Sequence, residues 1–275
     1  MTQSSFTTAD GCRLHYVDEG AGLPVLWQHG LGATQSQAAE VFPASSGFRR
    51  ITLECRGHAG SEIGAPDALS IGQFADDALA LMDHLQVERA AVGGISLGAA
   101  IALHLAVHHP QRVGALIIAR PAWLGESTPE RMRIYRDVAE LLARYGSEDG
   151  LRRLEASERY RQVSSQSPDN AASMRGLFHR ARPESTVALL SRIPMQGSGV
   201  SPEQMTRLSL PTLVIANERD YVHTIAMATE VAGLIPGAEL RILPAKDVDR
   251  ASYLDGFRAA LEEFLSDLTE GRFSA

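Results

Sequence analysis

The stretch AVGGISLGAA, Ala91 to Ala100, decides the fold. Small and apolar residues lead into the pentapeptide GISLG, which is centred on Ser96, and a run of Ala, Ile and Leu follows it. This order predicts a buried strand, a sharp turn and a helix. A serine between two glycines on such a turn has an exposed hydroxyl, because the glycines let the backbone pack closely. Ser96 is therefore the candidate nucleophile, and a glycine-rich turn that only packs is the alternative.

A second glycine-rich segment, HGLG at positions 29–32, directly follows another apolar run. A loop of this kind can direct a backbone N–H toward the serine, and the helix after Ser96 begins with N–H groups that lack helical partners. We expect the N–H groups of Leu31 and Leu97 to form an oxyanion hole. The side chain of His29 is expected to orient the loop, and a direct role for it at the site is the alternative.

The rest of the chain alternates between two kinds of segment. Short apolar or alternating runs predict strands at 14–17, 24–28, 50–54, 90–93, 115–119, 212–216 and 239–243. Apolar residues at helical spacing predict helices at 71–85, 97–107, 225–234 and 252–268. Strands that alternate with helices favour an α/β fold with a mainly parallel sheet. Residues 123–200 break the alternation, because they carry helical patterns and no convincing strand.

Composition excludes several classes of protein. The chain has 275 residues, a net charge of -7 and no basic cluster, which argues against nucleic acid as a partner. No apolar run approaches the roughly 20 residues that a membrane helix needs. The first residues, MTQSSFTTADG, lack the features of a secretory signal, so we expect a cytoplasmic protein with Cys12 and Cys55 as free thiols. The two cysteines make no zinc motif, and we expect no metal.

Four motifs, QHGLGA, ECRGHAGS, GGISLG and PTLVIANERD, stand in the order and spacing of one known family. The chain resembles the α/β-hydrolase superfamily, in particular its small esterases, enol-lactonases and haloperoxidase-like members. The resemblance implies a mostly parallel sheet with helices on both faces and a helical cap inserted after the sixth strand. The core is then residues 1–122 and 201–275, and the cap is residues 123–200. The resemblance also implies that Asp220 is the acid of a catalytic triad, whereas an N-terminal helix cap is its alternative role.

The family's histidine is missing from its usual place. It normally follows the last strand, and here that segment reads ILPAKDVDRASY, with Asp247 and Val248 where a glycine and the histidine are expected. No histidine follows His223 in the chain. A serine hydroxyl is a poor nucleophile without a positioned base, so the sequence predicts an incomplete triad.

Several groups are candidates to replace the histidine or to contact substrate. His223 lies three residues after Asp220, near a predicted helix start, and is one candidate base. A carboxylate from Asp247 or Asp249 is a second, although its ordinary pKa makes it a weak base for an alcohol. Lys246, the only lysine in the chain, is a third and could instead bind an anion.

Arg120 is the candidate for binding a substrate carboxylate or phosphate. It follows a predicted strand at the edge of the sheet where α/β proteins bind ligands. In the family, the arginine that matches Arg56 anchors its loop by hydrogen bonds, and the loop with His58 shapes the pocket.

The leading prediction is an α/β-hydrolase-fold enzyme that acts on a small ester, lactone or related carbonyl compound through Ser96. It needs no cofactor, and its partners are a small-molecule substrate and, if an apolar cap helix pairs two subunits, a second copy of the chain. A lyase or isomerase on the same fold is the alternative of a different reaction class. A catalytically silent protein that binds a small molecule is the third hypothesis.

Overall fold

The computed structural model describes residues 4–45, 47–125 and 130–271. Residues 1–3 and 272–275 of the predicted core, and 126–129 of the predicted cap, lie outside the described residues. The strands are β1 (Ser4–Thr7), β2 (Arg13–Gly20), β3 (Gly22–Gln28), β4 (Gly47–Leu53), β5 (Ala90–Ile95), β6 (Val113–Ala119), β7 (Thr212–Asn217) and β8 (Glu239–Leu243).

All eight strands form one sheet, in the order β1-β2-β4-β3-β5-β6-β7-β8. β1 pairs with β2 and β2 with β4 in antiparallel fashion, and every other pair is parallel. The central strands β5 and β7 are buried along their whole length, as expected for strands covered on both faces. The predicted α/β fold with a mostly parallel sheet is confirmed.

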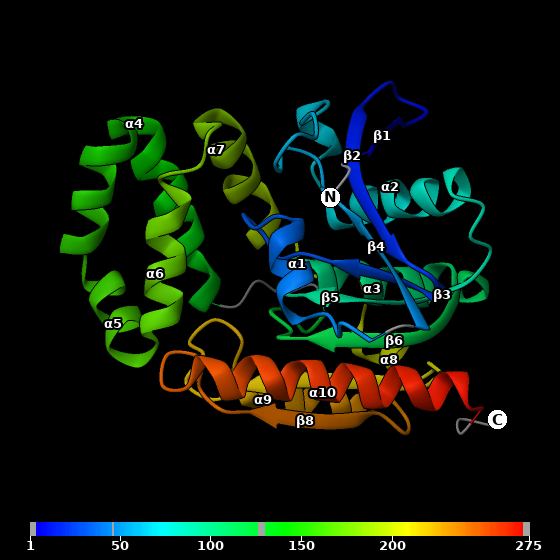
Figure 1. The fold of residues 1–275 in the computed structure, drawn as a ribbon. Coiled ribbons are helices and arrows are strands. Elements are labelled where there is room, and N and C mark those ends of the chain that lie inside the picture. Colours follow the sequence, from blue (N-terminus) through cyan, green and yellow to red (C-terminus); the bar gives the residue numbers. More distant parts are fainter. Residues whose placement is uncertain (1–3, 46, 126–129, 272–275) are drawn as a thin grey trace.

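The helices of the core cover both faces of the sheet (Figure 1). They are α1 (Gln35–Val41), α2 (Ile71–His84), α3 (Leu97–His108), α8 (Pro202–Met205), α9 (Ile225–Leu234) and α10 (Arg250–Thr269). Side chains of α2, α3 and α9 pack in one apolar cluster, and those of α1 and α10 pack in a second cluster on the other face. α3 is apolar apart from His104 and His108, and most of its residues are buried under the neighbouring elements. In the described part of the chain no helix combines the length and apolarity that crossing a membrane requires.

Four further helices stand between β6 and β7, and we call them the helical insertion. They are α4 (Arg133–Ala156), α5 (Glu158–Gln166), α6 (Pro168–Leu177) and α7 (Pro183–Arg192). Figure 1 shows them grouped beside the sheet rather than on either of its faces. Of residues 123–200, the described ones contain helices and no strand, as the sequence pattern predicts.

Three short elements escape the sequence patterns: β1, α1 and the four-residue α8. β1 has only four residues, SSFT, and one of them, Phe6, is buried. α1 has seven residues, and Thr34 caps its start by accepting the N–H of Ser36. Elements this short carry too few apolar positions to establish a period, so their tertiary contacts determine them.

The turn at Ser96 is strained and closely packed. Ser96 has a φ of 56°, in a region that L-residues other than glycine rarely adopt. A Cβ on Gly94 would lie 2.6 Å from the carbonyl oxygen of Gln28 at the end of β3, and a Cβ on Gly98 would lie 2.5 Å from the same oxygen. Both flanking glycines are therefore required by the approach of α3 to β3.

Replacing Gly98 with alanine tests this packing. The new Cβ would meet backbone rather than a flexible side chain, so we expect Gly98→Ala to lower the free energy of unfolding by roughly 1–3 kcal/mol, the usual cost of overpacking. Gly114→Ala is the matched control, since its Cβ would have its nearest neighbour 3.5 Å away. Urea unfolding of both variants measures the difference, and equal stabilities would contradict the packing argument.

Candidate active site

Three polar residues follow three neighbouring parallel strands. Ser96 comes directly after β5, Arg120 directly after β6, and Asp220 three residues after β7. The sheet register pairs Ile95 with Ala119, and Ala119 in turn with Ile215. The carboxyl ends of these strands therefore meet at one edge of the sheet, where α/β folds bind their ligands.

The side chain of His223 connects Ser96 to Asp220. Its Nε2 lies 2.8 Å from Ser96 Oγ, and its Nδ1 lies 3.0 Å from Asp220 Oδ2 and 3.1 Å from Oδ1. An ionised carboxylate can only accept hydrogen bonds, so Nδ1 carries the proton and Nε2 accepts the hydroxyl proton of Ser96. All three side chains are buried. The arrangement is that of a nucleophile, a base and a carboxylate that orients the base.

The prediction that Ser96 lacks a nearby histidine is therefore wrong, because an imidazole lies within hydrogen-bonding distance of its hydroxyl. The segment after β8 has no histidine, as the sequence shows, but an imidazole reaches Ser96 from the β7–α9 turn instead. His223 was one of the candidate bases, and the others lie elsewhere. The reason is local: three residues of turn are enough to fold the ring of His223 back onto the carboxylate of Asp220.

The remaining candidates have other partners. Asp247 pairs with Arg219, with 3.5 Å between the charged atoms, and Asp249 caps the first turn of α10 by accepting the N–H of Ser252. Lys246 Nζ lies 2.9 Å from Asp169 Oδ1, on α6 of the helical insertion. Val248, in the position where the resemblance placed the histidine, is 68% exposed.

Arg120 binds the acid of the site rather than an open pocket. Its Nε and Nη2 lie 2.8 Å and 2.6 Å from Asp220 Oδ2, and its Nη2 lies 3.6 Å from Asp169 Oδ2. The residue is 7% exposed and has a φ of 52°, so its backbone is held in the left-handed region. Asp220 thus receives hydrogen bonds from a guanidinium as well as from an imidazole.

Burial and charge act in opposite directions on the two titratable groups. Burial raises the pKa of Asp220, but the positive charge of Arg120 and the hydrogen bonds from His223 outweigh it and hold that pKa far below its usual range. Burial lowers the pKa of His223, Asp220 raises it, and Arg120 lowers it, with a net lowering. The site therefore keeps an ionised acid beside a neutral imidazole, the state that a general base needs.

Two buried histidines support the loop that contains Leu31. His29 Nδ1 donates to the carbonyl of Gly30 at 2.9 Å, while its Nε2 accepts the N–H of Cys55 at 3.2 Å. His58 Nε2 accepts the N–H of Gly32 at 3.0 Å. Burial lowers the pKa of both imidazoles, which fits their neutral, mixed donor and acceptor roles.

These contacts leave one amide of the loop available. Gly30 and Gly32 donate their N–H groups within the protein, to Gln37 Oε1 and to His58. The hydrogen bonds of the described residues include none from the N–H of Leu31. The N–H of Leu97 opens α3, where helical N–H groups have no helical acceptor.

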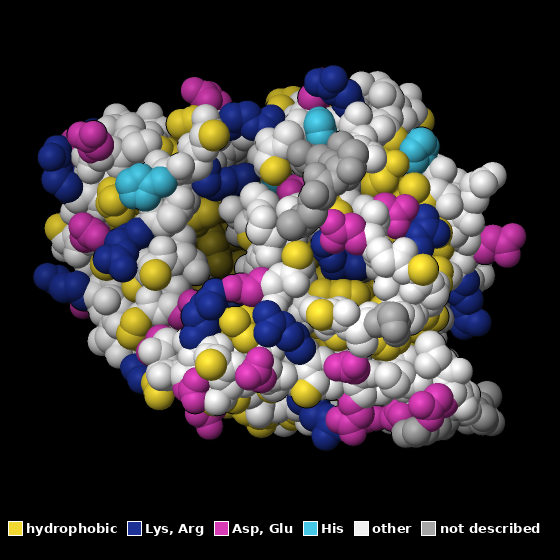
Figure 2. Space-filling model, viewed as in Figure 1, with side chains coloured by type: hydrophobic (Ala, Val, Ile, Leu, Met, Phe, Trp, Pro, Cys, Tyr) yellow, Lys and Arg dark blue, Asp and Glu magenta, His cyan; other side chains and the backbone are white. Residues whose placement is uncertain are grey.

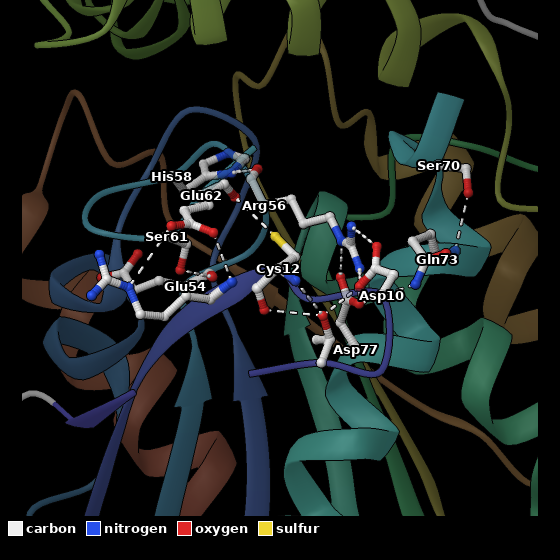
Figure 3. Close-up of polar contacts among 12 residues, drawn as sticks. Asp10, Cys12, Glu54, Arg56, His58, Ser61, Glu62, Ser70, Gln73 and Asp77 are labelled. Carbon is white, nitrogen blue, oxygen red and sulfur yellow. Dashed lines mark hydrogen bonds and ion pairs between the residues drawn. The ribbon is translucent and has the colours of Figure 1, made fainter. Parts of the chain in front are cut away.

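A cluster around Arg56 anchors the next loop, between β4 and α2 (Figure 3). The guanidinium of Arg56 makes two hydrogen bonds to Asp77 on α2, of 2.7 Å and 2.8 Å, and two to Asp10 in the β1–β2 turn, of 2.7 Å and 3.0 Å. Ser61 Oγ donates to the carbonyl of Glu54 at 2.6 Å in the same loop. The cluster fixes the backbone that carries His58, and through it the position of Gly32.

Two residues between β6 and β7, Asn170 on α6 and Arg131 just before α4, contact the turn that carries His223. Asn170 Oδ1 accepts the N–H of Val222 at 2.9 Å, and Arg131 Nε donates to the carbonyl of Val222 at 2.6 Å. Sequence reasoning missed both, because contacts made 52 and 91 positions away leave no local pattern. The isolated Asn-Ala-Ala run at 170–172 looks like ordinary helix surface, yet Asn170 is 3% exposed.

The space next to Ser96 is small and mostly apolar. A cavity of about 10 Å³ is lined there by Ser96, Ala99, Ala100, Leu103, Ile118, Pro121, Ala122, Trp123, Ser198 and Val231. That volume is near the minimum for one water molecule. Figure 2 shows a hollow between the helical insertion and the core, with hydrophobic side chains at its floor and charged ones at its rim. Among the described residues no cluster of three His, Cys, Asp or Glu side chains is suited to a metal ion.

Comparison with known proteins gives the same fold and a consistent set of relatives. 3-Oxoadipate enol-lactonase 2 of Acinetobacter baylyi is 27% identical over 260 residues, covering 93% of this chain and 94% of its own. A 2-hydroxymuconate semialdehyde hydrolase of a Pseudomonas strain is 28% identical and covers 85% and 83% of the two chains.

Solved structures agree. The crystal structure of an enol-lactonase from Burkholderia xenovorans matches with a TM-score of 0.73 and 25% identity, over 93% of this chain and 97% of that one. A thermophilic esterase from Thermogutta terrifontis has the same fold, with a TM-score of 0.73 and 24% identity over 99% and 98%. The family model of the alpha/beta hydrolase fold matches residues 24–249, which span every element from β3 to the end of β8. This chain belongs to the α/β-hydrolase fold family.

Proposed function

We propose that the protein is a serine hydrolase of small esters or lactones, with Ser96 as nucleophile, His223 as base and Asp220 as the acid that orients the base. One observation carries the proposal: His223 Nε2 lies 2.8 Å from Ser96 Oγ while its Nδ1 contacts Asp220. That distance is within the reach of direct proton transfer. The names of the relatives, an enol-lactonase and a semialdehyde hydrolase, support a carbonyl substrate.

In the proposed reaction, Ser96 Oγ attacks the carbonyl carbon as its proton passes to His223 Nε2. The carbonyl oxygen becomes an oxyanion, which the N–H groups of Leu31 and Leu97 stabilise. The imidazolium then gives its proton to the leaving alcohol oxygen, and an acyl group stays on Ser96. A water molecule, deprotonated by His223, attacks this ester and releases the acid and free Ser96.

The surroundings of Ser96 favour a compact acyl group. The adjoining cavity has small walls at Ala99, Ala100 and Ala122, and Leu103 and Trp123 close it. The helical insertion acts as the cap over this site, with the hollow of Figure 2 between it and the core. The acyl group then lies at Ser96 and points at this cavity, which holds about one water molecule and must widen to admit the group, and the alcohol or the rest of the lactone lies toward the hollow.

Replacing Ser96 with alanine tests the nucleophile. We expect hydrolysis of p-nitrophenyl acetate to fall by at least about 10³-fold, because the covalent route is lost and only the oxyanion site acts on bound ester. A serine-directed organophosphonate should label the wild type in a one-to-one ratio and leave Ser96→Ala unlabelled, as intact-mass measurement will show. Equal slow turnover by both proteins, with no labelling, would contradict the proposed hydrolase activity and favour a lyase, an isomerase or a binding protein.

The position of the base can be tested by moving the histidine. We expect His223→Ala to lose activity to a similar extent as Ser96→Ala, because the two residues act as a unit. Adding Val248→His to this variant places a histidine where the family normally has one. We expect no recovery, because the side chain at 248 is exposed and Arg120 already contacts Asp220 Oδ2. Recovery of esterase activity in the double variant would contradict the geometric argument against position 248, whereas unchanged activity of His223→Ala alone would contradict the proposed base.

The charge of Arg120 should set the acid limit of activity. His223 must be neutral to accept the proton, and Arg120 lowers its pKa. Replacing Arg120 with methionine removes this effect, so the pKa of His223 rises and the acid limb of the kcat/KM profile moves to higher pH. Arg120→Lys keeps the charge and is expected to move the limb less. A profile for Arg120→Met that shifts to lower pH, or does not shift, contradicts this role.

A further inference from the structure

The segment between β6 and β7 contacts the turn that carries the proposed base at both backbone polar groups of Val222, its N–H and its carbonyl. Asn170 Oδ1 accepts the N–H of Val222, and Arg131 Nε donates to its carbonyl oxygen. Arg131 Nη2 also donates to the carbonyl of Ala122, just after β6, at 3.3 Å. Val222 directly precedes His223, so both contacts act one residue from the imidazole.

Without these contacts from outside, the turn would be held only by hydrogen bonds among its own residues. The N–H groups of Val222 and His223 both donate to Asp220 Oδ1, at 3.1 Å and 2.9 Å. These two hydrogen bonds hold the turn to Asp220, its own first residue. They do not fix the position of the turn, which follows β7, relative to Ser96, which follows β5. Asn170 supplies a shorter second acceptor for the same Val222 N–H, from an element that is separate from both strands.

Helix α6 is itself held in place by an ion pair to the core. Asp169, next to Asn170, contacts Lys246 Nζ at 2.9 Å with Oδ1 and Arg120 at 3.6 Å with Oδ2. Asp169 and Lys246 are 20% and 24% exposed at their side chains, so water screens this pair only in part. Lys246 is on the segment after β8 that lacks the family's histidine, and it is the only lysine in the chain.

We propose that Asn170 is a positioning residue for His223, and that Lys246 keeps α6 in the register this requires. Asn170 touches neither the reacting atoms nor Ser96. It holds the N–H of Val222, in the peptide group one residue before the one that leads into His223, and thereby restrains the direction in which the His223 ring points. The inference rests on the proposed triad, and it gives the insertion a part in assembling the base in addition to covering the substrate.

The proposal predicts a loss of kcat rather than of substrate binding. A displaced base slows proton transfer strongly, because a misplacement of about 1 Å can cost roughly 100-fold in rate. We expect Asn170→Ala to lower kcat for p-nitrophenyl acetate by roughly 10- to 100-fold, with KM changed by less than about twofold. The rate of Ser96 labelling by an organophosphonate should fall in parallel, since it reports on the Ser96–His223 pair with little contribution from substrate fit.

Asn170→Asp, Lys246→Met and Arg175→Met make the test specific. Asn170→Asp retains an oxygen that can accept the Val222 N–H, so it should recover most of the kcat when measured well above the acid limb, where His223 is neutral. Lys246→Met should lower kcat in the same direction but less, and its effect should not multiply with that of Asn170→Ala, because both act through α6. Arg175→Met on the same helix removes an ion pair within the insertion, to Glu155, and should leave kcat unchanged.

The outcomes separate this inference from the proposed function. If Ser96→Ala and His223→Ala abolish activity while Asn170→Ala retains wild-type kcat and labelling rate, the positioning role is overturned and the triad stands. A change in KM alone would also overturn it, because Asn170 would then serve substrate binding. If Asn170→Ala does not fold, Asn170→Asp and Lys246→Met carry the test, and thermal melting of each variant shows whether a lost rate is a lost fold.

Discussion

The close approach of the turn at Ser96 to the Gln28 carbonyl is the constraint on which the site depends. It leaves no room for a Cβ at Gly94 or Gly98, and it accompanies the left-handed backbone of Ser96. That conformation turns the hydroxyl out at the end of β5, beside the ends of β6 and β7. Because the carboxyl ends of neighbouring parallel strands lie side by side, the sheet itself places Arg120 and Asp220 close together. The remaining contacts refine this position.

Placing the proposed acid and base on one turn changes which contacts must hold the site together. When the two residues follow different strands, the sheet fixes their separation. Here Asp220 and His223 are three residues apart, so their mutual contact is local and depends little on the rest of the fold. The orientation of the whole turn toward Ser96 then becomes the variable to control. Arg120, after β6, holds the turn through the carboxylate of Asp220. Asn170 on α6 and Arg131 just before α4 hold it through the N–H and the carbonyl of Val222.

The sequence predicts the features that hydrophobic periodicity and the glycines and prolines between segments indicate. The buried strands, the glycine-flanked turn and the helical nature of residues 130–192 all have a local signal, and the structure contains them. The site was harder, because the family's order of motifs led to a histidine after β8 that the chain does not have. The D-x-x-H spacing of Asp220 and His223, directly after a strand, was the signal available. Its weight could not be judged without knowing that Arg120 also binds the carboxylate of Asp220.

The segment after β8 lacks the family's histidine, yet another of its residues contacts side chains next to the site. Val248 is exposed, and Asp247 pairs with Arg219. Lys246, in contrast, reaches Asp169 on the insertion, and Asp169 also faces Arg120. The alternating charges of Lys246, Asp169, Arg120 and Asp220 therefore run from that segment to the acid of the site. Within this row, each inner side chain faces a charge of the opposite sign on both sides. Through this series of ion pairs, Lys246 in the loop that lacks the histidine is linked to Asp220, with the side chains of Asp169 and Arg120 between them.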